Sequence, residues 1–490
     1  MNTDISRDAV WREELRTALT AKERTSIPRV VMPQLPADFR VKSNHEVNQG
    51  LSQGQAVLEA SRCLDCPDPQ CIQGCPVSIN IPSFIKNIER GEILTAAKIL
   101  KHTSALPAVC GRVCPQEKQC ESRCIYNKMK KQPVAIGYLE RFAADFEREN
   151  IKANNIELRP SATEKNGMDI AVVGSGPAGL SFAGDMIKKG YNVTVYEALH
   201  EIGGVLKYGI PEFRLPNIVV EAEIDRLRAE GVNFVKDCII GKTISYEQLH
   251  ELGYDGIFVA SGAGLPRFMG IPGENYIGIM SANEYLTRIN LMGAGRPGED
   301  TPVLKGNRVA VIGGGNTAMD SVRTALRQGS QKAMIVYRRS LEEMPARVEE
   351  VHHAQEEGVE FMTLCNPIEY IADEKGRVKA MRVQRMELGE PDASGRRSPV
   401  PVEGAVEEIE VDLVIVSVGV SPNPLIPNAI PQLEVSRRGT IVVNEDSMQS
   451  SIYDIYAGGD IVRGGATVIL AMGDGRRAAA AMDAELRKQR

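Results

Sequence analysis

The chain has 490 residues, which is too long for one compact core and predicts about three domains at ~150 residues each. Its 43% hydrophobic and 25% charged residues are typical of a globular protein and exclude collagen-like, coiled-coil and low-complexity structures. A formal net charge of −6 argues against broad electrostatic binding to nucleic acid or anionic lipid, so small molecules and protein partners are expected. We expect a cytoplasmic protein, because no apolar run approaches the ~20 residues of a membrane span and the charged N-terminus lacks the apolar stretch of a signal peptide.

Eight of the ten cysteines lie in two close groups near the N-terminus. The first group, spaced x2, x4 and x3 and followed by Pro, is Cys63, Cys66, Cys71 and Cys75, and the second is Cys110, Cys114, Cys120 and Cys124. This spacing, in a chain without an export signal, favours iron–sulfur clusters over disulfides and over zinc, which typically uses two Cys-x2-Cys pairs. In two-cluster ferredoxins the Cys before Pro binds the other cluster, which would apply to Cys75. The isolated Cys238 and Cys365 are expected to be buried thiols.

A first Gly-rich turn follows an apolar strand predicted at 169–173 and precedes a predicted helix, the order of a dinucleotide-binding fold. The glycines allow a tight turn, and the helix N-terminus offers N–H groups to a pyrophosphate. A second strand ends at Glu197, 18 residues after Gly179, where a carboxylate can accept hydrogen bonds from ribose hydroxyls. The residues expected to bind this first dinucleotide are Gly174, Ser175, Gly176, Pro177, Ala178, Gly179, Glu197, Gly203, Gly204 and Val205.

A second strand, turn and helix follow at 308–325, and predict a second dinucleotide site with Gly313, Gly315, Asn316 and Thr317 in its turn. The next strand ends in Arg338 and Arg339 instead of an acid, with Arg347 a little beyond. Guanidinium groups can pair with a 2′-phosphate, so the site favours NADP(H) over NAD(H). The alternative is that these arginines form a solvated face.

Near the C-terminus, an apolar strand predicted at 451–457 ends in Gly-Gly-Asp460, and a predicted helix begins at Thr467. In two-dinucleotide flavoproteins such an Asp usually meets the ribityl chain of the flavin, and the helix N-terminus could stabilise a negatively charged reduced flavin. The alternative is an ordinary buried strand and helix. Hydride transfer between stacked rings requires no acid–base residue, so we predict no catalytic side chain.

These motifs divide the chain. Residues before about 165 lack Gly-rich turns and carry apolar residues at helical spacing. We predict an α/β protein with a helical iron–sulfur domain at 1–165, followed by two Rossmann-like domains in a glutathione-reductase-like arrangement. The FAD domain is expected at 166–292 and 420–490, and the NADP(H) domain at 293–419.

The order of these motifs resembles the small (beta) subunit of NADPH-dependent glutamate synthase over nearly the whole chain. The similar segments are VVGSGPAGL at 172–180, YGIPEFRLP at 208–216, YRR at 337–339 and AGGDIVR at 457–463. EMPAR at 343–347, MELGEP at 386–391 and ATVILAMGDG at 466–475 look more like one branch of that family. That branch contains the large subunit of NADH-dependent ferredoxin:NADP⁺ oxidoreductase, sulfide dehydrogenase alpha subunits and homotetrameric glutamate synthases. The N-terminal module also resembles the start of dihydropyrimidine dehydrogenase.

The resemblance implies a ligand set that spacing alone does not supply. By it, Cys63, Cys66, Cys71 and Cys124 hold one [4Fe–4S] cluster, and Cys75, Cys114, Cys120 and Glu140 hold another. Cys110 would then be a bystander, whereas the plain cysteine count favours Cys110 as the eighth ligand. The similar segments also place Arg214, Asp460 and Thr467 among the cofactor-binding residues.

The resemblance implies an NADPH-dependent oxidoreductase that exchanges hydride between NADPH and FAD and passes single electrons through the clusters to a partner. The partner would be the glutamate synthase large subunit or the small flavosubunit of ferredoxin:NADP⁺ oxidoreductase. Alternatives are the large subunit of an electron-bifurcating ferredoxin:NADP⁺ oxidoreductase, a self-sufficient sulfide or polysulfide oxidoreductase, and a non-catalytic assembly subunit. The first sixty residues are longer than expected for the branch and are a candidate surface for a partner or for homo-oligomer formation.

Overall fold

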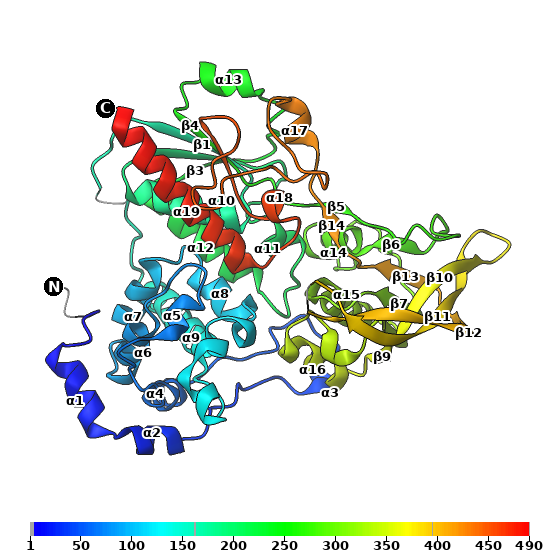
Figure 1. Cartoon of the computed structure of the whole chain (residues 1–490), viewed down its shortest axis with the longest axis horizontal. Coiled ribbons are helices and arrows are strands. Elements are labelled where there is room, and N and C mark those ends of the chain that lie inside the picture. Colours follow the sequence, from blue (N-terminus) through cyan, green and yellow to red (C-terminus); the bar gives the residue numbers. More distant parts are fainter. Residues whose placement is uncertain (1–3, 161–162, 394, 490) are drawn as a thin grey trace.

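The computed structural model describes residues 4–160, 163–393 and 395–489 (Figure 1). The N-terminal region is helical, as predicted, and no strand of the described residues precedes β1. It comprises α1 (Val10–Ala18), α2 (Ala21–Ser26), α3 (Ala37–Arg40), α4 (Gln53–Ser61), α5 (Gln70–Gln73), α6 (Ile81–Glu89), α7 (Ile93–Lys101), α8 (Pro107–Val113), the 3-10 helices η1 (Gln116–Lys118), η2 (Glu121–Arg123) and η3 (Ile125–Met129), and α9 (Ile136–Ala153).

Local side-chain chemistry sets the ends of these helices. Ser52 and Gln55 form a capping box at the start of α4, and the Asn80 side chain accepts a hydrogen bond from Ser83 N at the start of α6. Helices α8 and α9 approach so closely that a Cβ added at Gly111 would lie 2.5 Å from Arg141 N. Of the clustered cysteines, Cys71 lies on α5 and Cys110 on α8, whereas Cys63, Cys66 and Cys114 lie on or beside the connections between helices.

The first sheet is parallel and has the strand order β15-β4-β1-β2-β3. Its strands are β1 (Asp169–Val173), β2 (Asn192–Tyr196), β3 (Asn233–Val235), β4 (Gly256–Val259) and β15 (Ile455–Ala457). The associated helices are α10 (Pro177–Lys188), α11 (Val205–Tyr208), α12 (Asn217–Glu230), α13 (Tyr246–Glu251), α17 (Leu425–Ala429), α18 (Asp460–Arg463), α19 (Val468–Leu486) and η5 (Arg487–Gln489). The C-terminal part of the chain thus returns to the first sheet through β15.

The second sheet is also parallel, with the order β6-β13-β7-β8-β9. It contains β6 (Ile279–Ser281), β7 (Arg308–Ile312), β8 (Lys332–Tyr337), β9 (Glu360–Thr363) and β13 (Leu413–Val416), with α14 (Ala282–Asn290), α15 (Asn316–Arg327), η4 (Leu341–Glu343) and α16 (Val348–Glu356). An antiparallel sheet of β10 (Cys365–Ala372), β11 (Val378–Pro391) and β12 (Arg397–Glu410) projects from it, and β5 (Leu265–Pro266) pairs with β14 (Val420–Ser421) where the chain crosses between the two halves. Because β6 pairs with β13, the second sheet begins before the boundary expected between residues 292 and 293.

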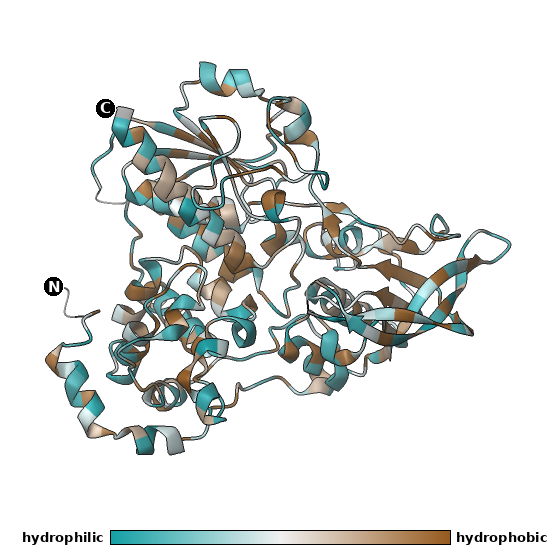
Figure 2. Ribbon diagram, in the orientation of Figure 1, coloured by the Kyte–Doolittle hydropathy of each residue, from teal (hydrophilic) through white to brown (hydrophobic). Residues whose placement is uncertain are grey.

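The apolar cores show which parts pack as one body. Leu106 of α8, Phe182 of α10 and Met472 of α19 belong to a single core that joins the helical region to the first sheet. The second sheet has a core on each face, and successive residues of β7 such as Val309 and Ala310 alternate between them. The strands of both parallel sheets are mainly hydrophobic (Figure 2), as expected for strands covered on both faces. Within the described residues, none of the helices combines the length and the apolar character needed to cross a bilayer.

Candidate cofactor site

A single large cleft lies where the carboxyl ends of both parallel sheets meet, and its volume is about 1750 Å³. Pockets for one small molecule are typically about 300–1,000 Å³, so this cleft has room for more than one cofactor-sized ligand. Both Gly-rich turns open into it. The expected residues that line it are Gly174, Ser175, Gly176, Pro177, Ala178, Glu197, Gly204, Val205, Arg214, Gly313, Gly315, Asn316, Thr317, Arg338, Arg339, Asp460 and Thr467.

The Gly-rich turn after β1 packs tightly against the protein on one side and leaves its backbone accessible on the other. Gly174 has a φ of +104°, and a Cβ at Gly179 would lie 2.0 Å from Gly174 O. Gly179 and Gly203 do not line the cleft, so their role here is close packing of the turn. At Gly176, by contrast, an added Cβ would meet no chain atom within 4 Å, which leaves the backbone open to a pyrophosphate.

Glu197 is fixed at the end of β2. Its Oε2 accepts hydrogen bonds from Ser175 N at 2.9 Å and Ser175 Oγ at 2.5 Å, and its Oε1 accepts from Leu199 N at 2.9 Å. Ser175 Oγ in turn accepts from Gly203 N at 2.9 Å. This network orients the carboxylate, which retains acceptor capacity for a ribose hydroxyl.

The second turn repeats this construction. Gly313 has a φ of +138°, and a Cβ there would lie 2.2 Å from Ser417 O. Gly315 is open, with no chain atom within 4 Å of an added Cβ. Asn316 Oδ1 accepts from Arg347 N at 2.9 Å, which fixes the first residue of α15.

The three arginines expected at the 2′-phosphate differ in their exposure and in their position relative to the cleft. Arg338 is exposed at the cleft, whereas Arg339 is 5% exposed and donates from Nη2 to Asp392 at 2.5 Å. Arg396, on the connection between β11 and β12, lines the same cleft. The sequence gives no signal for Arg396, because the antiparallel sheet folds back from a distant part of the chain.

The expectation for Arg347 is not supported. Arg347 lies outside the cleft and is 4% exposed. Its guanidinium donates to Arg112 O at 2.5 Å, Gln116 Oε1 at 2.9 Å and Glu349 at 2.8 Å. It therefore ties α16 to the helical region instead of facing a nucleotide.

The Gly-Gly-Asp turn and α19 form another wall of the cleft. Asp460 Oδ1 accepts from Ala466 N at 2.8 Å, and burial raises the pKa of this carboxyl. Asp474 Oδ2 accepts from Gly459 N at 3.0 Å and so fixes the turn from α19. Thr467 caps α19, which directs the N-terminus of that helix at the cleft.

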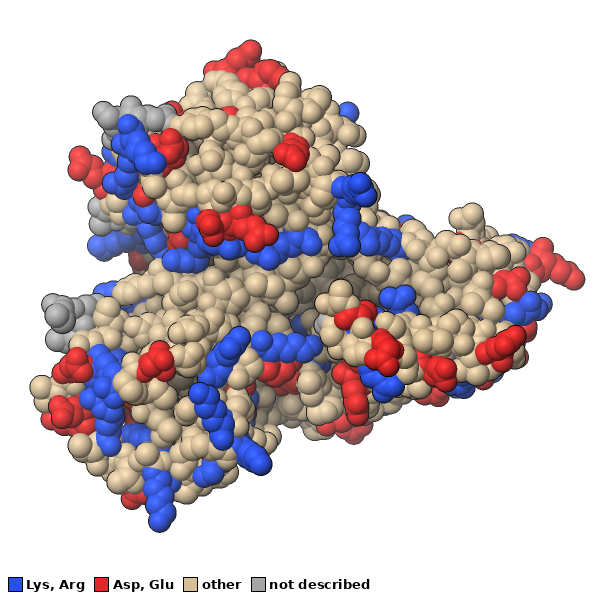
Figure 3. All heavy atoms as spheres, viewed as in Figure 1, with Lys and Arg blue, Asp and Glu red and all other residues tan. Residues whose placement is uncertain are grey.

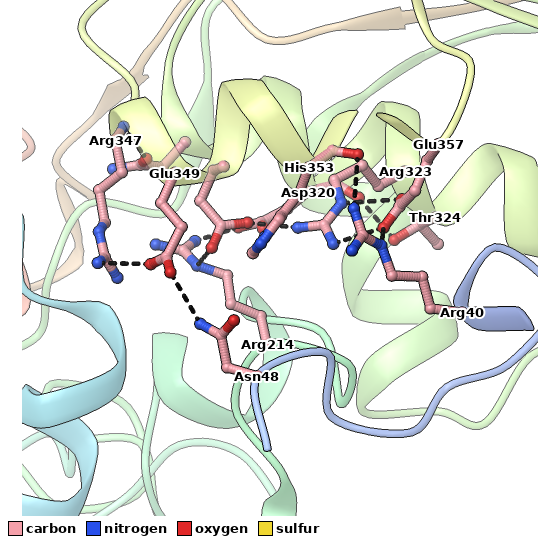
Figure 4. A network of polar contacts seen from close by, with 12 residues as sticks. Arg40, Asn48, Arg214, Asp320, Arg323, Thr324, Arg347, Glu349, His353 and Glu357 are labelled. Carbon is pink, nitrogen blue, oxygen red and sulfur yellow. Dashed lines mark hydrogen bonds and ion pairs between the residues drawn. The ribbon is translucent and has the colours of Figure 1, made fainter. Parts of the chain in front are cut away.

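Arg214 lines the cleft as expected, but its guanidinium is engaged in a buried ionic network (Figure 4). Its Nη1 lies 2.8 Å from Asp320 Oδ2 on α15, and its Nε lies 3.5 Å from Glu350 Oε1 on α16. Burial raises the pKa of Glu350, but Arg214 and Arg323 outweigh burial and lower it to about 2. Burial raises the pKa of Asp320 to about 6, against the opposing effect of Arg214. Sequence patterns did not identify Asp320 or Glu350.

The N-terminal extension enters the same network. Arg40 Nε lies 3.0 Å from Glu357 Oε1, and Glu357 also pairs with Arg323 at 2.8 Å. Asn48 Nδ2 donates to Glu349 Oε1 at 3.1 Å. The extension thus links the second sheet to the helical region (Figure 4).

Four cysteines gather at one side of the helical region. Burial raises the pKa of the Cys63 thiol to about 11, with a contribution from Cys124. Burial also raises the pKa of Cys71, and the charges of Cys63, Cys124 and Cys66 add to this effect. The four thiols that the resemblance assigns to one cluster are therefore close enough to interact.

The other cysteines surround Glu140. Burial raises the pKa of Glu140 to about 8, and its Oε1 is buried without a hydrogen-bond partner. Its charge contributes to the raised pKa values of Cys75 and Cys120, for which burial is the main cause. For Cys114, a hydrogen bond with Cys110 lowers the pKa, but burial and the charge of Glu140 outweigh it. Cys110 also lies here, with Sγ 3.5 Å from Met472 Sδ. An orphaned carboxylate oxygen among thiols fits a ligand for a cluster iron.

Among the described residues, no three His, Cys, Asp or Glu side chains converge on one point as the ligands of a single ion would. The isolated Cys238 and Cys365 are buried, as predicted.

We predict that Gly176→Ala lowers FAD retention at least tenfold while leaving the fold intact, because the new methyl group meets the pyrophosphate and no chain atom. Flavin absorbance after gel filtration and far-UV circular dichroism provide the two readouts. Gly54→Ala, at a helix position where an added Cβ also meets nothing within 4 Å, is the matched control. Full flavin retention by Gly176→Ala would show that the cofactor does not approach this turn.

Comparison with known proteins matches two family models to successive parts of the chain. Residues 40–152 match the family model described as dihydropyrimidine dehydrogenase domain II, 4Fe-4S cluster, and residues 168–475 match that of pyridine nucleotide-disulphide oxidoreductase. Among solved structures, Mycobacterium tuberculosis FprA in complex with NADPH shares the fold, with a TM-score of 0.55 at 21% identity over 66% of this chain and 86% of that chain.

Relatives found by sequence have higher identity to this chain than that structure does. The NADP(+)-dependent formate dehydrogenase subunit beta of Moorella thermoacetica is 37% identical over 85% of this chain and 60% of its own length. The glutamate synthase [NADPH] small chain of Escherichia coli (strain K12) is 36% identical over 92% of this chain and 96% of its own length, and that of Azospirillum brasilense is 36% identical over 91% and 92%. On this similarity, which spans nearly the whole of both chains, the protein belongs to the family of the glutamate synthase [NADPH] small chain.

Proposed function

We propose that this chain is the NADPH-oxidising, electron-exporting subunit of a larger redox enzyme. As a member of its family it is an NADPH-dependent oxidoreductase with FAD and [4Fe–4S] cofactors. When bound, FAD accepts two electrons from NADPH as a hydride, and the clusters carry electrons one at a time.

One observation carries the proposal: α19 connects the cleft to a cysteine group. Its N-cap, Thr467, lines the cleft, while Met472 contacts Cys110 and a Cβ at Gly473 would lie 2.9 Å from Pro76 O. The five residue steps from Thr467 to Met472 span only about 8 Å along a helix. The cleft and the cysteine group proposed to hold the second cluster are therefore neighbours in one packed body.

The chain's residues bind and orient the two nucleotides. We assign FAD to the first turn, where the N-terminus of α10 faces the pyrophosphate and Glu197 orients a ribose. NADPH is assigned to the second turn at the N-terminus of α15, with Arg338 and Arg339 at the 2′-phosphate. The ionic network of Arg214 and Asp320 holds the two turns at one cleft, so that the reacting rings can stack.

The chain's thiols and one carboxylate would hold two clusters. We assign Cys63, Cys66, Cys71 and Cys124 to one, and Cys75, Cys114, Cys120 and Glu140 to the other. The partner that receives the electrons is proposed to be a glutamate synthase large subunit or an equivalent electron-accepting subunit. Because reduced thiols at this density suit a reducing compartment, we place the protein in the cytoplasm.

Nucleotide choice tests the second site. Replacing Arg338 and Arg339 with Gln removes two charge-assisted pairs worth roughly 1.5–3 kcal/mol each, so kcat/KM for NADPH should fall at least about a hundredfold. The value for NADH should change little. Arg382→Gln, which alters an exposed arginine of β11, is the control. Equal losses with both nucleotides would mean that the arginines only maintain the fold.

The second cluster tests the role of Glu140. Glu140→Ala should change the EPR signal of one cluster or remove its iron, because a carboxylate ligand is lost. Cys110→Ser should leave both clusters in place, since this thiol contacts Met472 and is not needed as a ligand. If Cys110→Ser removes a cluster and Glu140→Ala removes none, Cys110 is the eighth ligand.

A further inference from the structure

A strongly basic surface lies beside the cysteines of the helical region. We call it the basic face and define it by four exposed side chains, Arg123, Lys128, Lys130 and Lys131. The sequence from 122 to 132 contains no Asp or Glu, although acids outnumber bases in the whole chain, 64 to 58. Lys and Arg side chains gather over this part of the helical region in Figure 3. The basic face is therefore positively charged, although the net charge of the whole chain is negative.

The basic face directly covers the cysteine segments. Arg123 and Ile125 flank Cys124, whose side chain is only partly buried. A Cβ added at Gly74 would lie 2.9 Å from Arg123 Cγ and 3.1 Å from Cys120 Cα, so Arg123 packs against the C-terminal end of α5, between Cys71 and Cys75. A partner seated on this face would lie next to Cys124 and near the segment that carries Cys120.

The face also has an apolar centre. Ile125 is 36% exposed and Met129 is 39% exposed, and both lie on η3 among the basic side chains. Lys131 is fixed at one edge, where its Nζ donates to Thr25 O at 2.6 Å. Small apolar contacts within a charged ring suit the brief, weakly bound encounters of electron-transfer proteins, whose interfaces are small.

We propose that the basic face is the surface through which electrons leave or enter the chain, and that its partner is a protein electron carrier with an acidic surface around its redox centre. Opposite charges would steer the carrier onto the face and orient its centre towards Cys124. This inference rests on the proposed function and adds the docking surface and the chemistry of the partner.

The test uses a plant-type [2Fe–2S] ferredoxin, an acidic carrier, as the probe. The reconstituted holoprotein should oxidise two reduced ferredoxins and convert one NADP⁺ and one proton to NADPH. The triple variant Lys128→Glu, Lys130→Glu and Lys131→Glu should slow this reaction at least tenfold at low ionic strength. Raising NaCl from about 20 to about 500 mM should slow the wild type towards the variant, because salt screens the attraction.

Two controls separate docking from the rest of the reaction. Lys242→Glu, Lys375→Glu and Lys379→Glu make the same charge change at exposed sites outside the cleft and should not alter the rate. Reduction of basic cytochrome c by NADPH should change in the opposite direction, becoming faster in the basic-face variant.

The possible failures are distinguishable. If NADPH does not bleach the flavin of the wild type, the proposed function itself is contradicted. If NADPH bleaches the flavin, the proposed function stands. The docking proposal is then overturned either if reduced ferredoxin does not react at low salt or if it reacts at the same rate with both triple variants.

Discussion

The buried ionic network between α15, α16 and the loop that carries Arg214 joins the second sheet to the rest of the chain beside the cleft. The second sheet has its own apolar cores, and charged pairs such as Arg214 with Asp320 at 2.8 Å connect it to the rest of the chain. Removing one partner from a buried pair costs about 3–5 kcal/mol, because the remaining charge is left without compensation. This junction lies between the elements that carry the two Gly-rich turns and contributes to their relative position.

The helical region and the first sheet are joined by apolar packing instead of ion pairs, because they share one apolar core. Residues of α8, α10 and α19 pack within it, and Cys110 contacts Met472 across the boundary. Such a core deforms little, so the distance between the flavin site and the nearest cysteine group should be constant. The junction with the second sheet is polar, and the junction between the helical region and the first sheet is apolar. This combination suits a protein that exchanges its nucleotide while the path of the electrons stays fixed.

Much of the fold and the site followed from the sequence, for identifiable reasons. The Gly-rich turns were predictable because tight turns and close packing require glycine, and the structure shows this at Gly174, Gly179 and Gly313. The helical region was predictable from its periodicity. The location of Arg347 was not, because proximity in sequence to a strand end does not determine which way a long side chain points.

The residues that the sequence could not identify act across long separations. Arg396 reaches the cleft from a connection far along the chain, and Arg40 pairs with Glu357 over 317 positions. Asp320 and Glu350 lie on helices whose patterns look ordinary, and only the tertiary structure brings them to Arg214. Spacing motifs identify what binds a cofactor locally, whereas the contacts that align two cofactors require the folded chain.

An anaerobic titration of the reconstituted protein with NADPH, followed by visible absorbance and EPR, tests the central claim most directly. The account predicts about one FAD and about eight iron atoms per chain, with bleaching of the flavin followed by the appearance of reduced cluster signals. Zinc in place of iron, with no acid-labile sulfide, would contradict the account.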